Sequence, residues 1–418
     1  MSESTIYAAS WLINPDTPPI AGGALLVSGA RVAAVGTLSE LAGAHSAPVV
    51  EFPGSAIIPG FVNAHTHLEL THFPSWRLRT HVEYNPRRFV DWIIQLVKIR
   101  RGLKDEDILA SLREGFRMSL ESGTTAVGEI VTNPALTPSY QASPLAGRLF
   151  FELLGHDPDR FRGMLDKALA VCEEQTGRLA AGLSPHSPYT IGEVSLALIR
   201  ETVSSRTLPL AIHISESREE ANFVFDTSGP LADQFYPFVG WQEYLMPPRH
   251  CSSTELLDRS GLLTSATLAI HCVHVTLSDA ETLKQRGVSV VLCPRSNERL
   301  DVGKAPLHIF NKLGIPLALG TDSLASNDSL SLWEEMRFSL DLFRHDLSPA
   351  EAFRMVTLGG AAALGIAASS GSLEPGKRAD FQVVGNAGTA AEHVLERVVC
   401  EGSVQEVYAG GERYVGSH

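Results

Sequence analysis

Residues 266–297 read ATLAIHCVHVTLSDAETLKQRGVSVVLCPRSN. Two short apolar runs, 266–275 and 288–297, flank the polar, helix-like segment 278–287. Runs of this length that are apolar almost throughout are typical of strands buried on both faces of a sheet. A strand, a helix and a second strand in this order predict a βαβ unit, in which the two strands lie parallel.

The same alternation extends in both directions along the chain. Helical patterns such as 159–175 and 331–343 separate most of the apolar runs, and further helices are predicted near 88–101 and 105–122. The eight runs are FVNAHTHL (61–68), TTAVGEIV (124–131), GRLFFELLG (147–155), LAAGLSPHS (179–187), LPLAIHISES (208–217), ATLAIHCVHV (266–275), VSVVLCPRSN (288–297) and IPLALGTDS (315–323). Eight such units predict an α/β fold that closes into a (β/α)8 TIM barrel.

The two ends of the chain carry a different pattern. Residues 5–58 read as short alternating strands with turns between them, and residues 371–415 return to strands and glycine-containing turns. We expect both ends to combine into one small β-sandwich domain. The predicted limits are 1–57 for the first part of this domain, 58–365 for the barrel and 366–418 for the second part.

Composition limits the classes of function that fit. The 418 residues are 44% hydrophobic and 19% charged, as in a globular protein with a large core. Lys and Arg number 34 against 47 Asp and Glu, and the net charge of −13 argues against nucleic acid or an anionic membrane as partner. The five cysteines are scattered and odd in number, which favours reduced thiols. Because the first residues lack a secretory signal pattern, we expect a cytoplasmic protein.

The first cluster of candidate site residues is His65 and His67, in NAHTHLEL. Residues two apart on a strand point to the same face, so both imidazoles could bind one metal ion. Two hydrogen-bonded histidines at a strand end would give the same pattern, and this alternative stays open.

Further polar side chains follow other predicted barrel strands. His213, His271 and Asp322 each end an apolar run, where a buried polar group needs a partner such as a metal ion. Glu216 lies three residues beyond His213, where it could reach the same site or cap the following helix. Histidines and an aspartate at one end of a barrel predict a divalent metal site, and these donors suit zinc or iron(II) better than magnesium or calcium.

Seven motifs follow one another along the chain: PGFVNAHTHLEL (59–70), GLSPHSPYT (182–190), AIHISES (211–217), AIHCVHV (269–275), CPRSN (293–297), LGTDSLASN (319–327) and GSLEPGKRADF (371–381). In order and spacing they resemble the motifs of the amidohydrolase superfamily, in the branch with cytosine, guanine and adenosine-type deaminases and triazine hydrolases. The chain resembles this superfamily from about residue 56 to 385. The resemblance implies a barrel flanked by a small β-sandwich, in agreement with the strand pattern.

The resemblance also implies a set of metal ligands. His65, His67, His213 and Asp322 would bind a single divalent ion. Superfamily members with two metals usually carry a bridging lysine at the fourth strand, and LAAGLSPHS contains none. One metal ion, and deamination of a ring amidine rather than hydrolysis of a cyclic amide, are therefore implied.

By the same resemblance, other residues would act on the substrate and on water. Glu216 would carry protons between the attacking water and the ring. His271 would orient and polarise that water, and Asp322 would help to hold it. His186, in SPHSPY at the end of the fourth strand, would face the substrate.

The resemblance implies that the substrate is an aminated purine nucleoside. HTHLEL, PRSN and GTDSLASN are most similar to the motifs of aminodeoxyfutalosine deaminases, which act on an adenine nucleoside carrying a benzoate group in menaquinone biosynthesis. The alternative is deamination of S-adenosylhomocysteine, methylthioadenosine or another 5′-modified adenosine, and guanine deaminase or triazine hydrolase activity comes third. A barrel that only binds or assembles would be expected to lack ligands, and here none is missing. A homodimer or a higher homo-oligomer is consistent with the resemblance.

The segment after the first barrel strand, 71–93, is predicted to form a flap over the barrel mouth. Four arginines in it could meet a substrate carboxylate or face solvent: Arg77, Arg79, Arg87 and Arg88. Phe89 and Trp92 lie at helical spacing, which favours packing in the core over lining a pocket.

Overall fold

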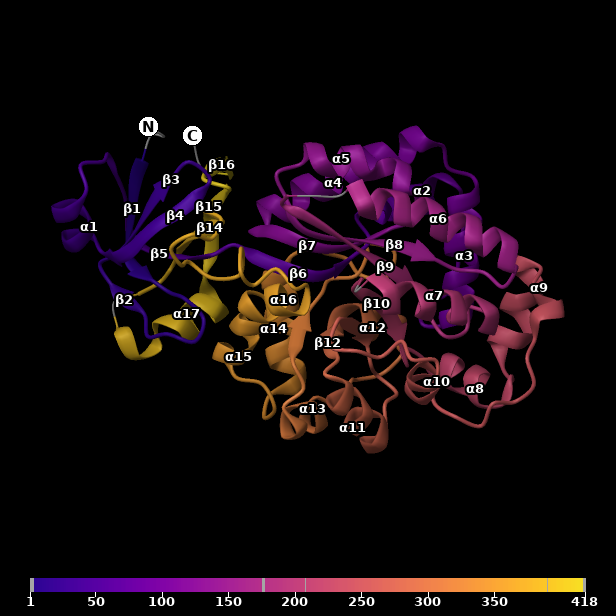
Figure 1. Cartoon of the computed structure of the whole chain (residues 1–418). Helices are drawn as coiled ribbons and strands as arrows, with labels where there is room; N and C mark the ends of the chain where they lie inside the picture. Colours follow the sequence, from indigo (N-terminus) through magenta and orange to yellow (C-terminus); the bar gives the residue numbers. More distant parts are fainter. Residues whose placement is uncertain (1–3, 175–176, 207, 389, 416–418) are drawn as a thin grey trace.

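Figure 1 shows the computed structural model of the chain, which describes residues 4–174, 177–206, 208–388 and 390–415. Within these residues the framework consists of two eight-stranded sheets. The first is parallel and contains β6 (Phe61–Thr66), β7 (Thr124–Val131), β8 (Ala146–Leu153), β9 (Leu179–Pro185), β10 (Leu210–Ile214), β11 (Thr267–His271), β12 (Ser289–Leu292) and β13 (Leu317–Leu319). Every predicted apolar run forms one of these strands, and each strand lies beside the one that precedes it in the chain.

The parallel sheet closes on itself where β6 meets the end of β13. The Asp322 amide donates a hydrogen bond to the His65 carbonyl oxygen at 3.1 Å. One residue earlier, the Thr321 amide donates to Asn63 Oδ1 at 3.0 Å, and Asn63 Nδ2 donates to the Thr321 hydroxyl at 2.7 Å. We call this junction the seam, and it confirms the predicted (β/α)8 barrel.

The barrel strands are apolar along their length because both of their faces are covered. Ile212 and Leu292 belong to a large cluster that includes helix residues such as Leu283. Their neighbours Ala211 and Val291 belong to a second cluster, formed mainly by the strands themselves. Successive side chains of a strand point to opposite faces, so neither face of these strands is left to solvent.

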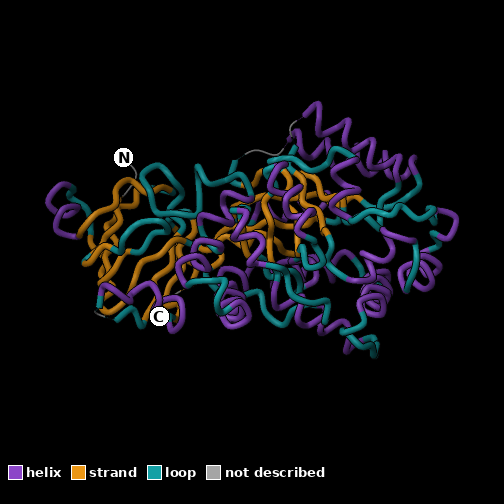
Figure 2. Tube along the Cα trace, turned by 90° about the horizontal axis from the view of Figure 1, so that it is seen from below, coloured by secondary structure: helices purple, strands orange, loops and turns teal. Residues whose placement is uncertain are grey.

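Helices surround the barrel strands, as Figure 2 shows. Those that follow the first strands are α2 (Phe73–Arg79), α3 (Phe89–Arg101), α4 (Asp105–Glu121), α5 (Thr137–Ala142), α6 (Pro158–Glu174) and α7 (Glu193–Arg206). Those that follow the later strands are α8 (Arg218–Asp226), α9 (Tyr236–Val239), α10 (Ser253–Arg259), α11 (Leu277–Arg286), α12 (Pro294–Leu300), α13 (Leu307–Leu313), α14 (Leu332–Phe343), α15 (Pro349–Met355) and α16 (Leu358–Ala363). Short turns of helix lie at η1 (Leu68–Leu70), η2 (Pro134–Leu136), η3 (Leu231–Phe235) and η4 (Gln242–Tyr244).

Helix α11 illustrates how the sequence sets these boundaries. The Thr276 hydroxyl accepts from the Asp279 amide, and the Asp279 carboxylate accepts from the Thr276 amide at 2.9 Å. This reciprocal pair satisfies amides that the first turn of a helix leaves unbonded. Gly287 ends the helix with φ 70°, a left-handed conformation that glycine adopts without strain.

The second sheet is mixed and draws its strands from both ends of the chain. Its strands are β1 (Ser4–Leu12), β2 (Ile20–Ala21), β3 (Gly23–Ser28), β4 (Arg31–Thr37), β5 (Val49–Pro59), β14 (Phe381–Gly385), β15 (Ser403–Ala409) and β16 (Glu412–Val415). Helices α1 (Leu38–Ala44), α17 (Val394–Glu401) and η5 (Ala391–His393) occur in the same two stretches of chain. Strand β5 pairs antiparallel with β14, so the two ends are joined in one small β domain, as predicted.

Figure 1 places this β domain, with both termini, at one end of the molecule. The chain leaves the mixed sheet at Pro59 and enters the barrel at Phe61. The domain limits 1–57, 58–365 and 366–418 stay a prediction. Among the helices of the described ranges, none is both long and apolar enough to span a bilayer.

Candidate active site

Five side chains converge where barrel strands end. His65, His213 and His271 belong to β6, β10 and β11. His67 directly follows β6, and Asp322 lies three residues beyond the end of β13. Donor atoms of His65, His67 and His213 lie within 4.8 Å of one another, and so do those of His65, His271 and Asp322. The structure therefore brings together all four predicted metal ligands, which we call the ligand set: His65, His67, His213 and Asp322.

His65 tests whether these residues fit a metal ion. Its side chain is completely buried, and neither ring nitrogen has a hydrogen-bond partner among the described residues. A buried polar group without a partner costs free energy, and a cation removes that cost by accepting the nitrogen lone pair. The orphaned imidazole therefore fits a metal ligand better than it fits a structural histidine.

His213 is oriented by a hydrogen bond on the far side of its ring. Its Nδ1 lies 2.8 Å from the carbonyl oxygen of His186, and a carbonyl oxygen can only accept. The hydrogen is therefore on Nδ1, and the Nε2 lone pair is available to a cation. Burial lowers the pKa of His213 well below its usual value, and the charges of neighbouring histidines lower it further. A neutral imidazole is the form that binds metal.

Asp322 is held by one of its carboxylate oxygens. Oδ2 accepts hydrogen bonds from the hydroxyls of Ser296 and Ser326, each at 2.7 Å. Oδ1 faces the histidines instead, 3.5 Å from His65 Nε2 and 3.6 Å from His67 Nε2. The hydroxyls orient the carboxylate and leave one oxygen for a cation, which is a common second layer around protein metal sites.

Each ring nitrogen of His271 has a polar side chain nearby. Its Nδ1 lies 2.9 Å from Asn297 Oδ1, so it donates there, and its Nε2 lies 3.6 Å from Glu216 Oε1. Burial is the main reason that its pKa falls to about 4. The neutral ring therefore presents a lone pair toward Glu216 and Asp322.

Glu216 is not the cap of α8. Ser217 occupies that position, and its hydroxyl accepts from the Glu220 amide. Glu216 is only 6% exposed, and it lines the cavity beside the ligand set. Burial raises the pKa of its carboxyl well above the usual value, and the charges of Asp322 and Glu220 raise it further. The structure therefore supports the interpretation that Glu216 lies at the site, and not the interpretation that it caps α8.

The backbone is strained at the points where the site residues leave their strands. Ser215, His271 and Asp322 have φ values of 53°, 71° and 58°, in the left-handed region that side chains other than glycine rarely adopt. Such positions cost on the order of 1 kcal/mol or more each and persist where the surrounding structure demands them.

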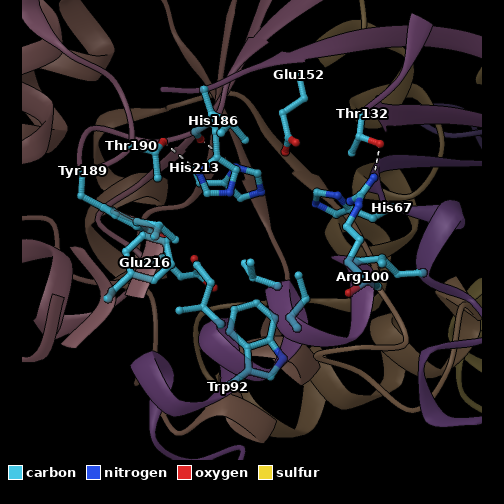
Figure 3. Close-up of a pocket in the computed structure, with 18 of the residues that line it drawn as sticks. His67, Trp92, Arg100, Thr132, Glu152, His186, Tyr189, Thr190, His213 and Glu216 are labelled. Atoms are coloured by element: carbon cyan, nitrogen blue, oxygen red, sulfur yellow. Dashed lines mark hydrogen bonds between the residues drawn. The ribbon is translucent and has the colours of Figure 1, made fainter. Parts of the chain in front are cut away.

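A cavity of about 560 Å³ opens above these residues (Figure 3). We call its two parts the floor and the wall. The floor consists of the strand-end residues His67, His186, His213, Glu216, His271 and Asp322. The wall comes from η1, α3 and the η3–η4 region and includes Leu70, Trp92, Ile93, Leu96, Val97, Arg100, Arg101, Phe235, Val239 and Trp241.

His186 lies in the floor, as predicted, and contributes in two ways. Its side chain lines the cavity, with Nδ1 3.1 Å from the Thr190 hydroxyl. Its backbone carbonyl orients the ring of His213, which the sequence did not indicate. Its role toward a substrate stays a prediction.

The predicted flap arginines are not part of the described cavity lining. Arg79 pairs with Asp107 at 3.1 Å, Arg87 lies 3.8 Å from Asp301, and Arg77 lies over the Tyr84 ring. The physical reason is the apolar cluster beneath this segment, which buries Phe73 and Trp76 and leaves the basic side chains outside. Of the two alternatives for Arg77, Arg79, Arg87 and Arg88, the structure favours solvent, because none of them lines the described cavity.

Trp92 combines two roles that the sequence presented as alternatives. It is buried in that apolar cluster, and it also lines the cavity. Its indole nitrogen donates to the Ala325 carbonyl oxygen at 2.9 Å, which ties α3 to the loop after β13.

Several site residues were missed. Ser296, Asn297 and Ser326 lie in the motifs CPRSN and LGTDSLASN, so their position beside site residues was a usable signal. Arg100 and Glu152 also line the cavity. Arg100 lies at the end of a helix, and no local pattern distinguishes it from an ordinary surface charge. Glu152 lies near the end of the predicted strand 147–155, and this position was a usable signal.

Comparison with known proteins agrees with this geometry. Residues 56–413 match the model of the amidohydrolase family. An aminodeoxyfutalosine deaminase of Deinococcus radiodurans is 31% identical over 82% of this chain and 81% of its own length. A 5-methylthioadenosine/S-adenosylhomocysteine deaminase of Halobacterium salinarum is 29% identical over 88% of this chain and 84% of its own length.

The fold is shared with a solved structure as well. A zinc-bound adenosine deaminase from Xanthomonas campestris superposes with a TM-score of 0.80 at 24% identity, covering 99% of this chain and 93% of that protein. The matched family model covers both the barrel and most of the β domain. The chain therefore belongs to the amidohydrolase family.

Proposed function

We propose that this chain is a hydrolytic deaminase of adenosine-type nucleosides that acts on 6-amino-6-deoxyfutalosine in menaquinone biosynthesis. The observation that carries the chemistry is that the ligand set lies beside Glu216 and His271 at the floor of a single cavity. Relatives from two deaminase groups support the nucleoside class. The cavity is of the size that proteins use for small molecules.

The ligand set offers three imidazoles and one carboxylate to a single divalent ion. This donor set suits zinc or iron(II), and the zinc in the Xanthomonas campestris structure supports the first. A divalent cation lowers the pKa of water toward about 7 and so makes hydroxide available at neutral pH.

Glu216 carries the proton in the proposed reaction. Burial raises the pKa of its carboxyl and so favours the protonated form, which can donate a proton to a nitrogen of the purine ring. Protonation makes the adjacent ring carbon electrophilic, and the oxygen of water adds there. The carboxylate then accepts a proton from the added water and passes it to the amino group. The carbon–nitrogen bond breaks and ammonia leaves. The remaining hydroxyl proton returns to the Glu216 carboxylate, and an oxo group remains.

His271 and Asp322 position the oxygen that attacks. The Asn297 hydrogen bond fixes the His271 ring with Nε2 as acceptor, so this nitrogen can take a hydrogen bond from the attacking water. Asp322 Oδ1 faces the same space, since Ser296 and Ser326 hold its other oxygen. Donors and acceptors fixed before the reaction lower the barrier without reorganising during it.

Ammonia release from purified protein tests the proposal. 6-Amino-6-deoxyfutalosine should give a higher kcat/KM than adenosine, 5′-methylthioadenosine or S-adenosylhomocysteine. A preference for adenosine would contradict the assignment of substrate while leaving the deaminase chemistry in place. Failure to release ammonia from any adenine nucleoside, with the metal fully loaded, would contradict the deaminase assignment itself.

Methylthioadenosine or S-adenosylhomocysteine is the second candidate substrate. The Halobacterium salinarum relative covers more of this chain than the Deinococcus radiodurans relative does, at similar identity. The apolar residues Leu96, Val97 and Phe235 in the wall would also accommodate a thioether group. The same assay separates the two candidates by their relative kcat/KM.

A further inference from the structure

Arg100, near the end of α3, is held in the wall of the cavity from one side. One of its terminal nitrogens, Nη2, donates to Glu69 Oε2 at 2.9 Å and also to the Thr132 hydroxyl, the bond drawn in Figure 3. Glu69 lies in η1 and is only 1% exposed. Its other oxygen accepts from the Thr132 amide at 2.9 Å. The guanidinium is therefore anchored at a fixed place.

The rest of this guanidinium faces the cavity. The Arg100 side chain is 30% exposed and lines the cavity, and the described residues offer no recorded hydrogen-bond partner to its Nε or Nη1. An arginine presents five N–H donors in a planar fork, which suits a carboxylate. A fixed cation with unused donors in a partly dry cavity is a recognition site for an anion.

Glu69 does not use up this capacity. Two donors of Thr132 satisfy the Glu69 carboxylate in addition to Arg100. Glu152 also lines the cavity from β8, and burial raises the pKa of its carboxyl while the charge of Arg100 lowers it. Arg101 is the other basic residue of the wall, but its side chain is exposed and its guanidinium lies 5.2 Å from the Phe238 ring centroid.

The placement of Arg100 relative to the floor defines which end of a ligand it meets. Figure 3 shows Arg100 on the opposite side of the cavity from Glu216 and Tyr189. Leu70 and Leu96 also line this cavity, beside the charged groups. A nucleoside with its purine at Glu216 would direct a 5′ substituent across the cavity, where an apolar ring could end in a carboxylate.

We propose that Arg100 is a specificity-determining residue that pairs with a carboxylate on the 5′ substituent of the substrate. This inference rests on the proposed function, since it takes the purine to be bound at Glu216. It assigns the contact with the substrate carboxylate to a residue that lines the cavity, in place of the arginines of the flap. A charge-assisted hydrogen bond of this kind corresponds to roughly a ten- to hundredfold difference in kcat/KM.

The test compares two nucleosides in the metal-loaded enzyme, one with and one without a carboxylate: 6-amino-6-deoxyfutalosine and 5′-methylthioadenosine. Arg100→Gln should lose about ten- to hundredfold in kcat/KM with the first, mainly through KM, and less than about threefold with the second. Arg79→Gln is the matched control, because Arg79 is exposed and paired with Asp107 outside the described cavity lining. It should change neither value.

A second variant guards against a folding defect. Removing Arg100 alone leaves Glu69 buried without its cation, which is destabilising. The double variant Arg100→Gln/Glu69→Gln removes both charges, and it should show the same selective loss with the carboxylated nucleoside. Arg101→Gln should leave the ratio of the two kcat/KM values within about threefold of the parent.

Three outcomes would overturn the assignment of Arg100. These are an equal loss with both nucleosides in the double variant, no loss with either, and a selective loss in Arg101→Gln instead. Turnover of S-adenosylhomocysteine and not of 6-amino-6-deoxyfutalosine by the parent is a separate result. That result contradicts the proposed substrate, and a selective loss with S-adenosylhomocysteine in Arg100→Gln would still support the carboxylate site.

Discussion

The floor and the wall of the cavity are built in different ways. Floor residues lie at strand ends of the barrel, and four of the six are buried. Hydrogen bonds from segments that follow neighbouring strands orient His213, His271 and Asp322. The wall comes from segments inserted between strands, and apolar packing rather than hydrogen bonding holds most of it in place. Of the two basic residues in the wall, Arg100 is fixed on one side and faces the cavity on the other.

This difference implies that the floor determines the chemistry of the reaction, whereas the wall determines which substrates are preferred. The barrel imposes the positions of floor residues, so a change there should affect every substrate alike. Wall segments connect strands without being part of the sheet, so they can vary while the barrel stays intact. Variants in the floor should therefore change kcat or metal content, whereas variants in the wall should change relative KM values or stability.

His67→Ala should have the largest effect, because it removes one of the four proposed metal ligands. The purified variant should lose its tightly bound divalent ion, and kcat should fall roughly 10³-fold, or about 4 kcal/mol of activation free energy. Metal analysis and ammonia release measure the two effects. His72→Ala is the control, since His72 is outside the described lining. A full equivalent of tightly bound metal in His67→Ala would contradict the ligand set.

Glu216→Gln should separate proton transfer from metal binding within the floor. The amide keeps the shape of the side chain but cannot carry a proton, so kcat should drop by roughly 10²-fold or more while metal content stays normal. Glu219→Gln, on the first turn of α8, serves as the control and should keep its activity. Near-normal turnover in Glu216→Gln would show that the carboxyl is not the proton carrier.

Ser296→Ala should have a smaller effect on the same floor. It removes one of the two hydroxyls that orient Asp322, and partners of this kind contribute roughly ten- to hundredfold to metal affinity. Competition with a chelator gives the affinity, and the variant should release metal at a lower chelator concentration than the parent. Unchanged affinity would mean that Ser326 alone holds the carboxylate.

His156→Phe should have the smallest effect, on the stability of the region beside the wall. Burial and the charge of Arg249 lower the pKa of His156 to about 4, against 6.5 for the free side chain. Its neutral form contributes stability above pH 6.5, and this contribution is lost as the pH falls toward 4. Lowering the pH from 7 to 4 should therefore reduce the free energy of unfolding of the parent more than that of His156→Phe, by on the order of 2 kcal/mol.

Urea denaturation at pH 7, 6, 5 and 4 measures this difference. Other buried histidines titrate in both proteins, so subtracting the two curves isolates His156. His308→Phe, at an exposed helix position, is the control and should run parallel to the parent. A pH-independent difference between His156→Phe and the parent would show that His156 does not titrate in this range.

The floor could be predicted from the sequence because local patterns determine it. Apolar runs mark the strands, and a polar residue directly after each run lies at the same end of the barrel. This reasoning placed His213, His271 and Asp322 together although they come from distant parts of the chain. The resemblance to a known family added roles that spacing alone could not assign.

The wall could not be predicted in the same way. Arg100 follows apolar residues at the end of α3, where basic residues are common on any helix. Its position in the cavity depends on the buried carboxylate of Glu69 and on Thr132, contacts between separate segments that no local pattern reports. For the flap, Phe73 and Trp76 decide which side faces inward, and their burial is a tertiary property.

The seam has a consequence for the order in which the enzyme is made. Asn63 and Thr321, which join β6 to β13, are 258 positions apart in the chain. At roughly 5–20 residues per second, a ribosome needs about 13–50 s to pass from the first half of the seam to the second. During that interval His65 and His67 have been synthesised without Asp322. If Asp322 is a ligand, as proposed, complete metal loading follows synthesis of almost the whole barrel, and a chain truncated before the last strand would hold at most a partial site.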